Sequence, residues 1–126
     1  MTGATLLLRQ IHPNFVQDGF ASSVAFRPNE FDQGLMSVYD GDLITAEASW
    51  THYTTVSKKK SVGATALTVD ECAAESLLAR SDPVPFPEHA VVDFTSVEEK
   101  HWRTKGKKLQ AKALARGWGY QPSAAG

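Results

Sequence analysis

Short apolar runs that stop at turn residues predict about five strands along the chain. Residues 5–10 are largely apolar, and residues 22–27 alternate apolar and polar side chains in the pattern of a half-buried strand. Three further strands are expected over residues 35–40, 61–69 and 90–94, each rich in β-branched or aromatic side chains. The first of these three strands is followed by an Asp-Gly pair, which is a strong turn signal.

Two short helices are predicted in the middle of the chain. Thr45 is a suitable N-cap for an amphipathic helix over residues 46–53. Thr68 and Glu71 have the spacing of a capping box, in which each side chain satisfies a backbone amide of the other. A second helix is therefore expected from residue 69 to about residue 79, with Cys72, Ala73, Ser76 and Leu77 directed inward.

A longer helix is predicted near the C-terminus, over residues 97–116. Ser96 and Glu99 fit a second capping box at its start, and Gly117 is the residue type preferred just after a helix. Residues recur there at the spacing of a core-facing stripe, namely Trp102, Gly106, Leu109 and Ala113. Beyond the helix, Trp118 and Tyr120 would suit a last short strand.

These elements together favour an α+β fold. The three prolines in residues 81–88 predict an extended connector, anchored by Phe86. The strands are grouped early and lack the long helical crossovers of a doubly wound parallel sheet. We therefore expect one α+β domain over residues 1–121, with the long helix packed on the sheet and residues 122–126 as a frayed tail.

Composition narrows the class of protein. A chain of 126 residues, 42% hydrophobic and 21% charged, is typical of one globular domain. Its one cysteine, Cys72, allows neither an intramolecular disulfide nor a zinc site with two or more cysteines, and a buried thiol is expected there rather than a nucleophile. No segment approaches the roughly 20 apolar residues of a membrane span, and no signal peptide is recognisable, so a cytoplasmic protein is predicted.

Charge is distributed unevenly, although the formal net charge is only −1. That value argues against a dedicated nucleic-acid binder. Cations nevertheless gather in the predicted C-terminal helix, where they either face water near the negative end of the helix dipole or contact an acidic protein face or phosphates. The candidate partner-binding residues are Arg103, Lys107, Lys108, Lys112 and Arg116.

Arg9 and His12 are the candidate catalytic residues if the protein is an enzyme. His12 precedes Pro13, where it would act as a general base or hydrogen-bond a backbone carbonyl to fix the turn. The spacing of the histidines matches no metal motif, so neither a metal nor a cofactor is expected. Asp93 is unusual in an apolar strand; it is expected to face solvent, with Arg9 as its partner if it is buried.

Three motifs resemble those of a family of small bacterial proteins of unassigned function. They are His12-Pro13-Asn14-Phe15, the Ser-x-Ala-Phe-x-Pro pattern that ends at Pro28, and Pro85-Phe86-Pro87-Glu88-His89. The resemblance extends over nearly the whole chain. It implies a bacterial origin and brings no activity with it.

A looser resemblance is to ADP-ribosyltransferases, which combine an arginine or histidine, a strand with serine or threonine, and a glutamate. Arg9 on the first strand, followed by Ser22-Ser23 and then by Ser37, is similar to the first two parts of that arrangement. The glutamate has no clear equivalent, and Glu71 and Glu88 are the two candidates.

The function favoured by the sequence is that of a small binding protein of the immunity or antitoxin type, which docks on a bacterial partner protein. The alternatives are an enzyme with Arg9 and His12 in one site and a nucleic-acid binder that uses the basic helix. Docking is favoured on the premise that polar residues are scattered over the surface. A single cavity lined by Arg9, His12 and a carboxylate would instead favour the enzyme.

Overall fold

The computed structural model describes residues 1–122 and has an antiparallel five-stranded sheet at its centre. The sheet order is β5-β1-β4-β7-β6, built from β1 (Leu6–Gln10), β4 (Leu35–Asp40), β5 (Ala64–Thr68), β6 (Leu78–Ser81) and β7 (His89–Asp93). A small hairpin pairs β2 (Val16–Gln17) with β3 (Phe20–Ala21). The helices are α1 (Ala46–Thr55), α2 (Val69–Ala73) and α3 (Trp102–Arg116), with 3₁₀ turns η1 (Pro13–Phe15), η2 (Ser23–Phe26) and η3 (Glu99–His101). The predicted α+β class is confirmed.

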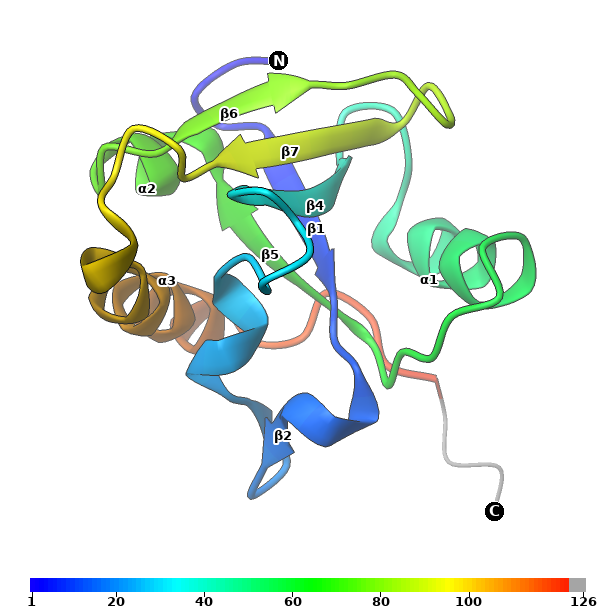
Figure 1. The fold of residues 1–126 in the computed structure, drawn as a ribbon. Coiled ribbons are helices and arrows are strands. Elements are labelled where there is room, and N and C mark those ends of the chain that lie inside the picture. Colours follow the sequence, from blue (N-terminus) through cyan, green and yellow to red (C-terminus); the bar gives the residue numbers. More distant parts are fainter. Residues whose placement is uncertain (123–126) are drawn as a thin grey trace.

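The sheet is covered on both faces, with α3 on one side and α1 on the other (Figure 1). The larger core lies under α3, where Leu109 and Ala113 pack with sheet residues such as Leu7 and Met36. A smaller cluster lies under α1 and includes Leu8, Tyr39 and Ala66 from the sheet. Strand alternation explains this division, because neighbouring residues such as Leu7 and Leu8 point to opposite faces.

Local helix signals in the middle of the chain act as the sequence predicts. Thr45 Oγ1 accepts a hydrogen bond from the Ala48 amide at 3.1 Å, which caps α1. The capping box of α2 is complete, because Thr68 Oγ1 accepts from the Glu71 amide and a Glu71 carboxylate oxygen accepts from the Thr68 amide. At the other end of the chain, Gly117 ends α3 with a φ of 83°, a conformation that favours glycine.

The expected strand over residues 22–27 is wrong, since these residues form η2. Ala25 and Phe26 are adjacent and both fully buried, whereas a strand would direct them to opposite faces. Helix α3 approaches η2 closely because Gly106 lacks a side chain: a Cβ there would lie 3.2 Å from the Ser23 carbonyl oxygen. Tertiary packing therefore outweighs the alternating pattern.

The second helix is much shorter than expected and ends at Ala73. Ser76 has a φ of 62°, and the chain then enters β6, which pairs with β7. Of the four residues expected to point inward, Cys72 and Leu77 are buried whereas Ala73 and Ser76 are exposed. The reversal at Ser76 places Leu77 in the core, a contact that a continuous helix would not make.

The capping box expected at Ser96 does not form, and α3 begins at Trp102 after the turn η3. The Trp102 indole donates to the Val97 carbonyl at 2.9 Å, which holds the preceding residues in a turn. Residues 118–122 contribute a single bridge, between Ala64 and Tyr120, instead of a strand.

The predicted frayed tail begins at residue 122, and residues 123–126 lie outside the described part of the chain. Within residues 1–122, none of the helices has the length and apolar character needed to cross a membrane.

Candidate functional site

A cleft forms where β1 and β4 separate. These strands pair only through Leu7 with Asp40 and Leu8 with Tyr39, whereas β1 continues beside β5 as far as Gln10. The earlier residues of β4 therefore pair with β7 on one side and have no β1 partner on the other. The resulting cleft has a volume of about 780 Å³.

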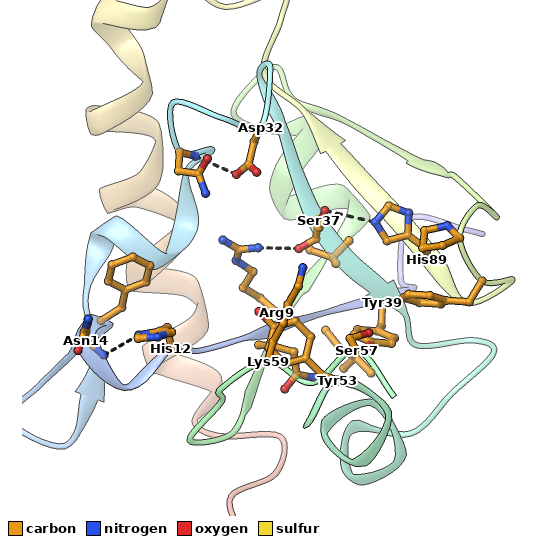
Figure 2. A pocket seen from close by; sticks show the side chains of 17 residues that line it. Arg9, His12, Asn14, Asp32, Ser37, Tyr39, Tyr53, Ser57, Lys59 and His89 are labelled. Carbon is orange, nitrogen blue, oxygen red and sulfur yellow. Dashed lines mark hydrogen bonds between the residues drawn. The ribbon is translucent and has the colours of Figure 1, made fainter. Parts of the chain in front are cut away.

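Arg9 lies at the floor of this cleft and bridges its two sides (Figure 2). Its Nε donates to the Ala25 carbonyl at 2.7 Å, and its Nη1 donates to the Ser37 carbonyl at 2.7 Å. Arg9 alternates with the fully buried Leu7 and Ile11 along the chain, so its side chain starts from the core-facing side of β1. Burial lowers the pKa of Arg9, but a guanidinium remains protonated in proteins.

His12 lines the same cleft and fixes the turn η1. Its Nδ1 accepts a hydrogen bond from the Asn14 amide at 3.0 Å, and its ring packs against Phe15. His12 therefore caps the turn, but the expected bond to a backbone carbonyl is wrong, because the ring accepts from a backbone amide. Because Nδ1 is an acceptor, the neutral ring carries its proton on Nε2 and presents a donor, not a base, from that nitrogen.

The rest of the lining comes from four separate segments. Asp32 lies on the loop before β4, where its Oδ2 accepts from the Asn29 amide at 2.9 Å. Lys59, which follows α1, places its Nζ 5.8 Å from the centre of the Tyr53 ring. Two basic side chains, Arg9 and Lys59, therefore line the cleft together with one carboxylate, Asp32.

Aromatic side chains form the wall nearest β7. Phe86 stacks on Tyr39 with 5.2 Å between ring centres and also contacts His52 and His89. The prediction that Phe86 anchors the proline-rich connector is confirmed. Tyr39 Oη lies 2.8 Å from His52 Nδ1, and burial raises the pKa of Tyr39 to about 12, so it remains a neutral phenol.

Ser37 and His89 complete the cleft and form a hydrogen-bonded pair that the sequence analysis missed as a pair. Ser37 Oγ lies 3.2 Å from His89 Nε2 (Figure 2). The two residues are 52 positions apart, so no local motif joins them. The sequence did contain one signal for the position of the cleft. This signal was Arg9, a charged residue at a core-facing position of an apolar strand.

The arrangement of ADP-ribosyltransferases is not reproduced. Arg9 and Ser37 share the cleft, but Ser22 and Ser23 are not among its lining residues, and no glutamate is. Glu71 instead binds Arg116, 2.9 Å from its guanidinium. The charged and titratable residues that do meet near Arg9 in the cleft therefore include His12 and Asp32.

Part of the basic helix is neutralised within the chain. Lys108 lies 3.6 Å from Glu75, and Arg116 pairs with Glu71. Arg103, Lys107 and Lys112 are exposed and have no ion-pair partner among residues 1–122. Docking through this helix, on a protein or on nucleic acid, stays a prediction.

Other candidate groups have structural surroundings. Cys72 is buried, and burial raises the pKa of its thiol to about 12. Asp93 is 19% exposed and pairs with Arg80, so the expected alternative pairing with Arg9 is wrong. Hydrogen bonds from Thr95, with the charge of Arg80, hold the Asp93 pKa below its usual value. Within residues 1–122, no three His, Cys, Asp or Glu side chains gather as a metal site requires.

The premise that polar residues are scattered is wrong, because Arg9, His12 and Asp32 line one cleft. No protein-family model, curated protein or solved structure matches this chain. The resemblance to small bacterial proteins therefore remains an expectation.

Proposed function

We propose that the protein binds a small anionic molecule, bearing a carboxylate or a phosphate group, in the cleft at Arg9. The observation that carries this proposal is a half-buried guanidinium that makes no ion pair within the described part of the chain, with Asp32 of the same cleft acting on it only from a longer distance. No acidic oxygen among residues 1–122 lies within 4 Å of Arg9. A half-buried cation without a close ion-pair partner is only partly compensated, and an anion from solution would supply that partner.

Arg9 also retains unused donors. A guanidinium has five N–H groups, and protein carbonyls accept from only two of them here, one on Nε and one on Nη1. The remaining N–H groups include both on Nη2. A planar fork of this kind matches the two oxygens of a carboxylate or phosphate, which is why arginine is common at such sites.

The surrounding groups favour an anion with a flat apolar part. His12 offers an Nε2–H donor, and Lys59 adds a second positive charge at the cleft. Phe15, Tyr53 and Phe86 supply aromatic surface in the same lining. Small-molecule sites commonly combine a mostly apolar lining with a few fixed polar groups in this way.

The test is thermal unfolding with inorganic phosphate, phenyl phosphate or benzoate. A ligand present at 100 times its Kd stabilises the native state by about 2.7 kcal/mol. For a chain of 126 residues that stabilisation corresponds to an increase in Tm of about 10 °C. A larger increase in Tm with phenyl phosphate than with phosphate would show that the aromatic lining contributes to binding. The increases with phosphate and with benzoate together show which of the two anion types is preferred.

Arg9→Met should abolish the increase in Tm, because it removes the charge while keeping an apolar stem. Arg103→Met is the matched control, since Arg103 is exposed on α3 and is not among the residues that line the cleft. If Arg9→Met does not fold, NMR of the wild-type protein is the alternative measurement. The resonance of the Arg9 Nε–H group should then shift when the anion is added. Equal stabilisation of wild type and Arg9→Met, or no shift at Arg9, would refute the proposal.

A further inference from the structure

Ser37, His89 and Asp82 form a connected set at the cleft. Ser37 Oγ lies 3.2 Å from His89 Nε2, and His89 Nδ1 lies 2.8 Å from the Asp82 carbonyl oxygen and 3.4 Å from its carboxylate Oδ2. A carbonyl oxygen can only accept, so Nδ1 carries a proton. In the neutral ring, the lone pair of Nε2 therefore faces the Ser37 hydroxyl, which donates to it.

The sheet holds this set in place. His89 lies opposite Tyr39 in the β4–β7 register, and Ser37 is two residues from Tyr39 on the same face. The Asp82 amide donates to the His89 carbonyl at 3.0 Å, which extends the β6–β7 ladder. Phe86 packs edge-on against the imidazole, which is only 14% exposed. The ring is thus fixed in both orientation and tautomer.

The nucleophilic end of the set is open to the cleft. Ser37 is exposed, and its carbonyl oxygen is the group to which Arg9 Nη1 donates. An anion bound at Arg9 would therefore lie close to the Ser37 hydroxyl. A serine with an adjacent imidazole, which a third group orients, is the arrangement that activates a hydroxyl for covalent catalysis.

We propose that Ser37 is a nucleophile, with His89 as its general base and Asp82 as a positioning residue, for the hydrolysis of a carboxylic ester that carries an anionic group. The anionic specificity rests on the proposed function of Arg9. Ser37 and His89 would be the catalytic residues, because they contact the reacting atoms. Arg9 would bind the substrate's charge and leave the ester carbonyl beside Ser37.

The reaction balances with water as the only other reactant. Ser37 Oγ bonds to the ester carbonyl carbon while its proton moves to His89 Nε2. The bond from that carbon to the alcohol oxygen then breaks, and the leaving oxygen takes its electron pair together with the proton from Nε2. Water next attacks the acyl-serine, gives a proton to Nε2, and the carboxylic acid departs as Ser37 Oγ recovers that proton.

The experiment labels the protein with a fluorophosphonate and identifies the modified residue by mass spectrometry. Ser37 Oγ would bond to phosphorus with loss of fluoride, and the label should be found on Ser37. Ser37→Ala should remove it, and His89→Gln should slow labelling at least about 100-fold, the lower end of the range for a general base. Ser57→Ala is the matched control, since Ser57 lines the same cleft and neither hydrogen bond of the His89 ring goes to it.

Ester turnover gives a second measurement. The mono-4-nitrophenyl ester of terephthalic acid, whose carboxylate cannot reach its own ester carbonyl, should be hydrolysed faster by the protein than neutral 4-nitrophenyl benzoate, and Arg9→Met should remove the difference. If Ser37→Ala fails to fold, the residue that carries the label in the wild-type protein still shows whether Ser37 is the nucleophile. Absence of a label on Ser37 in protein that binds phenyl phosphate through Arg9 overturns this inference and leaves the proposed function standing. A labelled Ser37 without anion binding supports the nucleophile and overturns the anionic specificity.

Discussion

Replacing Glu71 by glutamine tests how α3 is joined to α2 and the sheet. The Glu71 Oε1 accepts from the Thr68 amide at 2.8 Å and from Arg116 Nη1 at 2.9 Å. The same Arg116 nitrogen donates to the Ala66 carbonyl of β5 at 2.9 Å. Glutamine preserves the shape and the accepting oxygen, so Glu71→Gln removes the negative charge and little else.

The expected loss of stability is about 1 kcal/mol. A hydrogen bond to a charged group contributes about 1.5–3 kcal/mol and a neutral one about 0.5–1.5 kcal/mol, and the substitution exchanges the first for the second. The two side chains are 18% and 33% exposed, which places this pair between a surface pair and a buried one. For 126 residues, a loss of 1 kcal/mol lowers the Tm by about 4 °C.

The loss should depend on pH. Burial raises the Glu71 pKa, but hydrogen bonds from Arg116 and Thr68 and the charge of Arg116 outweigh it, so the folded-state pKa is lower than usual. A lowered pKa contributes stability that is fully present above the unfolded-state value of about 4.3 and is lost as the pH falls through the folded-state value. Wild type and Glu71→Gln should therefore differ fully at pH 7, and the difference should shrink as the pH falls below about 4.3.

Urea unfolding at pH 7 and at pH 3.5 measures both effects. Glu75→Gln is the matched control: Glu75 is also 18% exposed, but its contacts with Lys105 and Lys108 are 3.6 Å long, so a smaller loss is expected. The reasoning fails if Glu71→Gln loses no more stability than Glu75→Gln, or if the difference from wild type is the same at both pH values.

Two further predictions concern the core. Cys72, whose pKa burial raises to about 12, should react with a thiol reagent at pH 8 only as fast as the protein unfolds; rapid reaction in native buffer would contradict its burial. Gly106→Leu should destabilise the fold by about 1–3 kcal/mol, because even a Cβ there lies 3.2 Å from the Ser23 carbonyl oxygen; an unchanged Tm would show that η2 is free to move away.

Signals that act within a few residues were readable from the sequence. The N-cap Thr45, the capping box of Thr68 and Glu71, and the terminating Gly117 all work in the structure as expected. Each depends on hydrogen bonds or backbone angles that the local segment supplies itself. The apolar stripe of the last helix is equally local, and its residues Gly106, Leu109 and Ala113 are buried.

Only the tertiary structure decided the 3₁₀ turn η2 and the cleft. The Ala25 carbonyl accepts a hydrogen bond from Arg9, and the absence of a side chain at Gly106 lets η2 pack closely against α3. Residues distant in sequence therefore determine the structure of a segment whose alternating pattern predicts a strand. The cleft exists because β1 leaves β4 after Leu8, a consequence of strand pairing that no short pattern encodes. Arg9 and His12 were identifiable as candidates by residue type, whereas Ser37 and His89 meet only because the sheet register places them on one face.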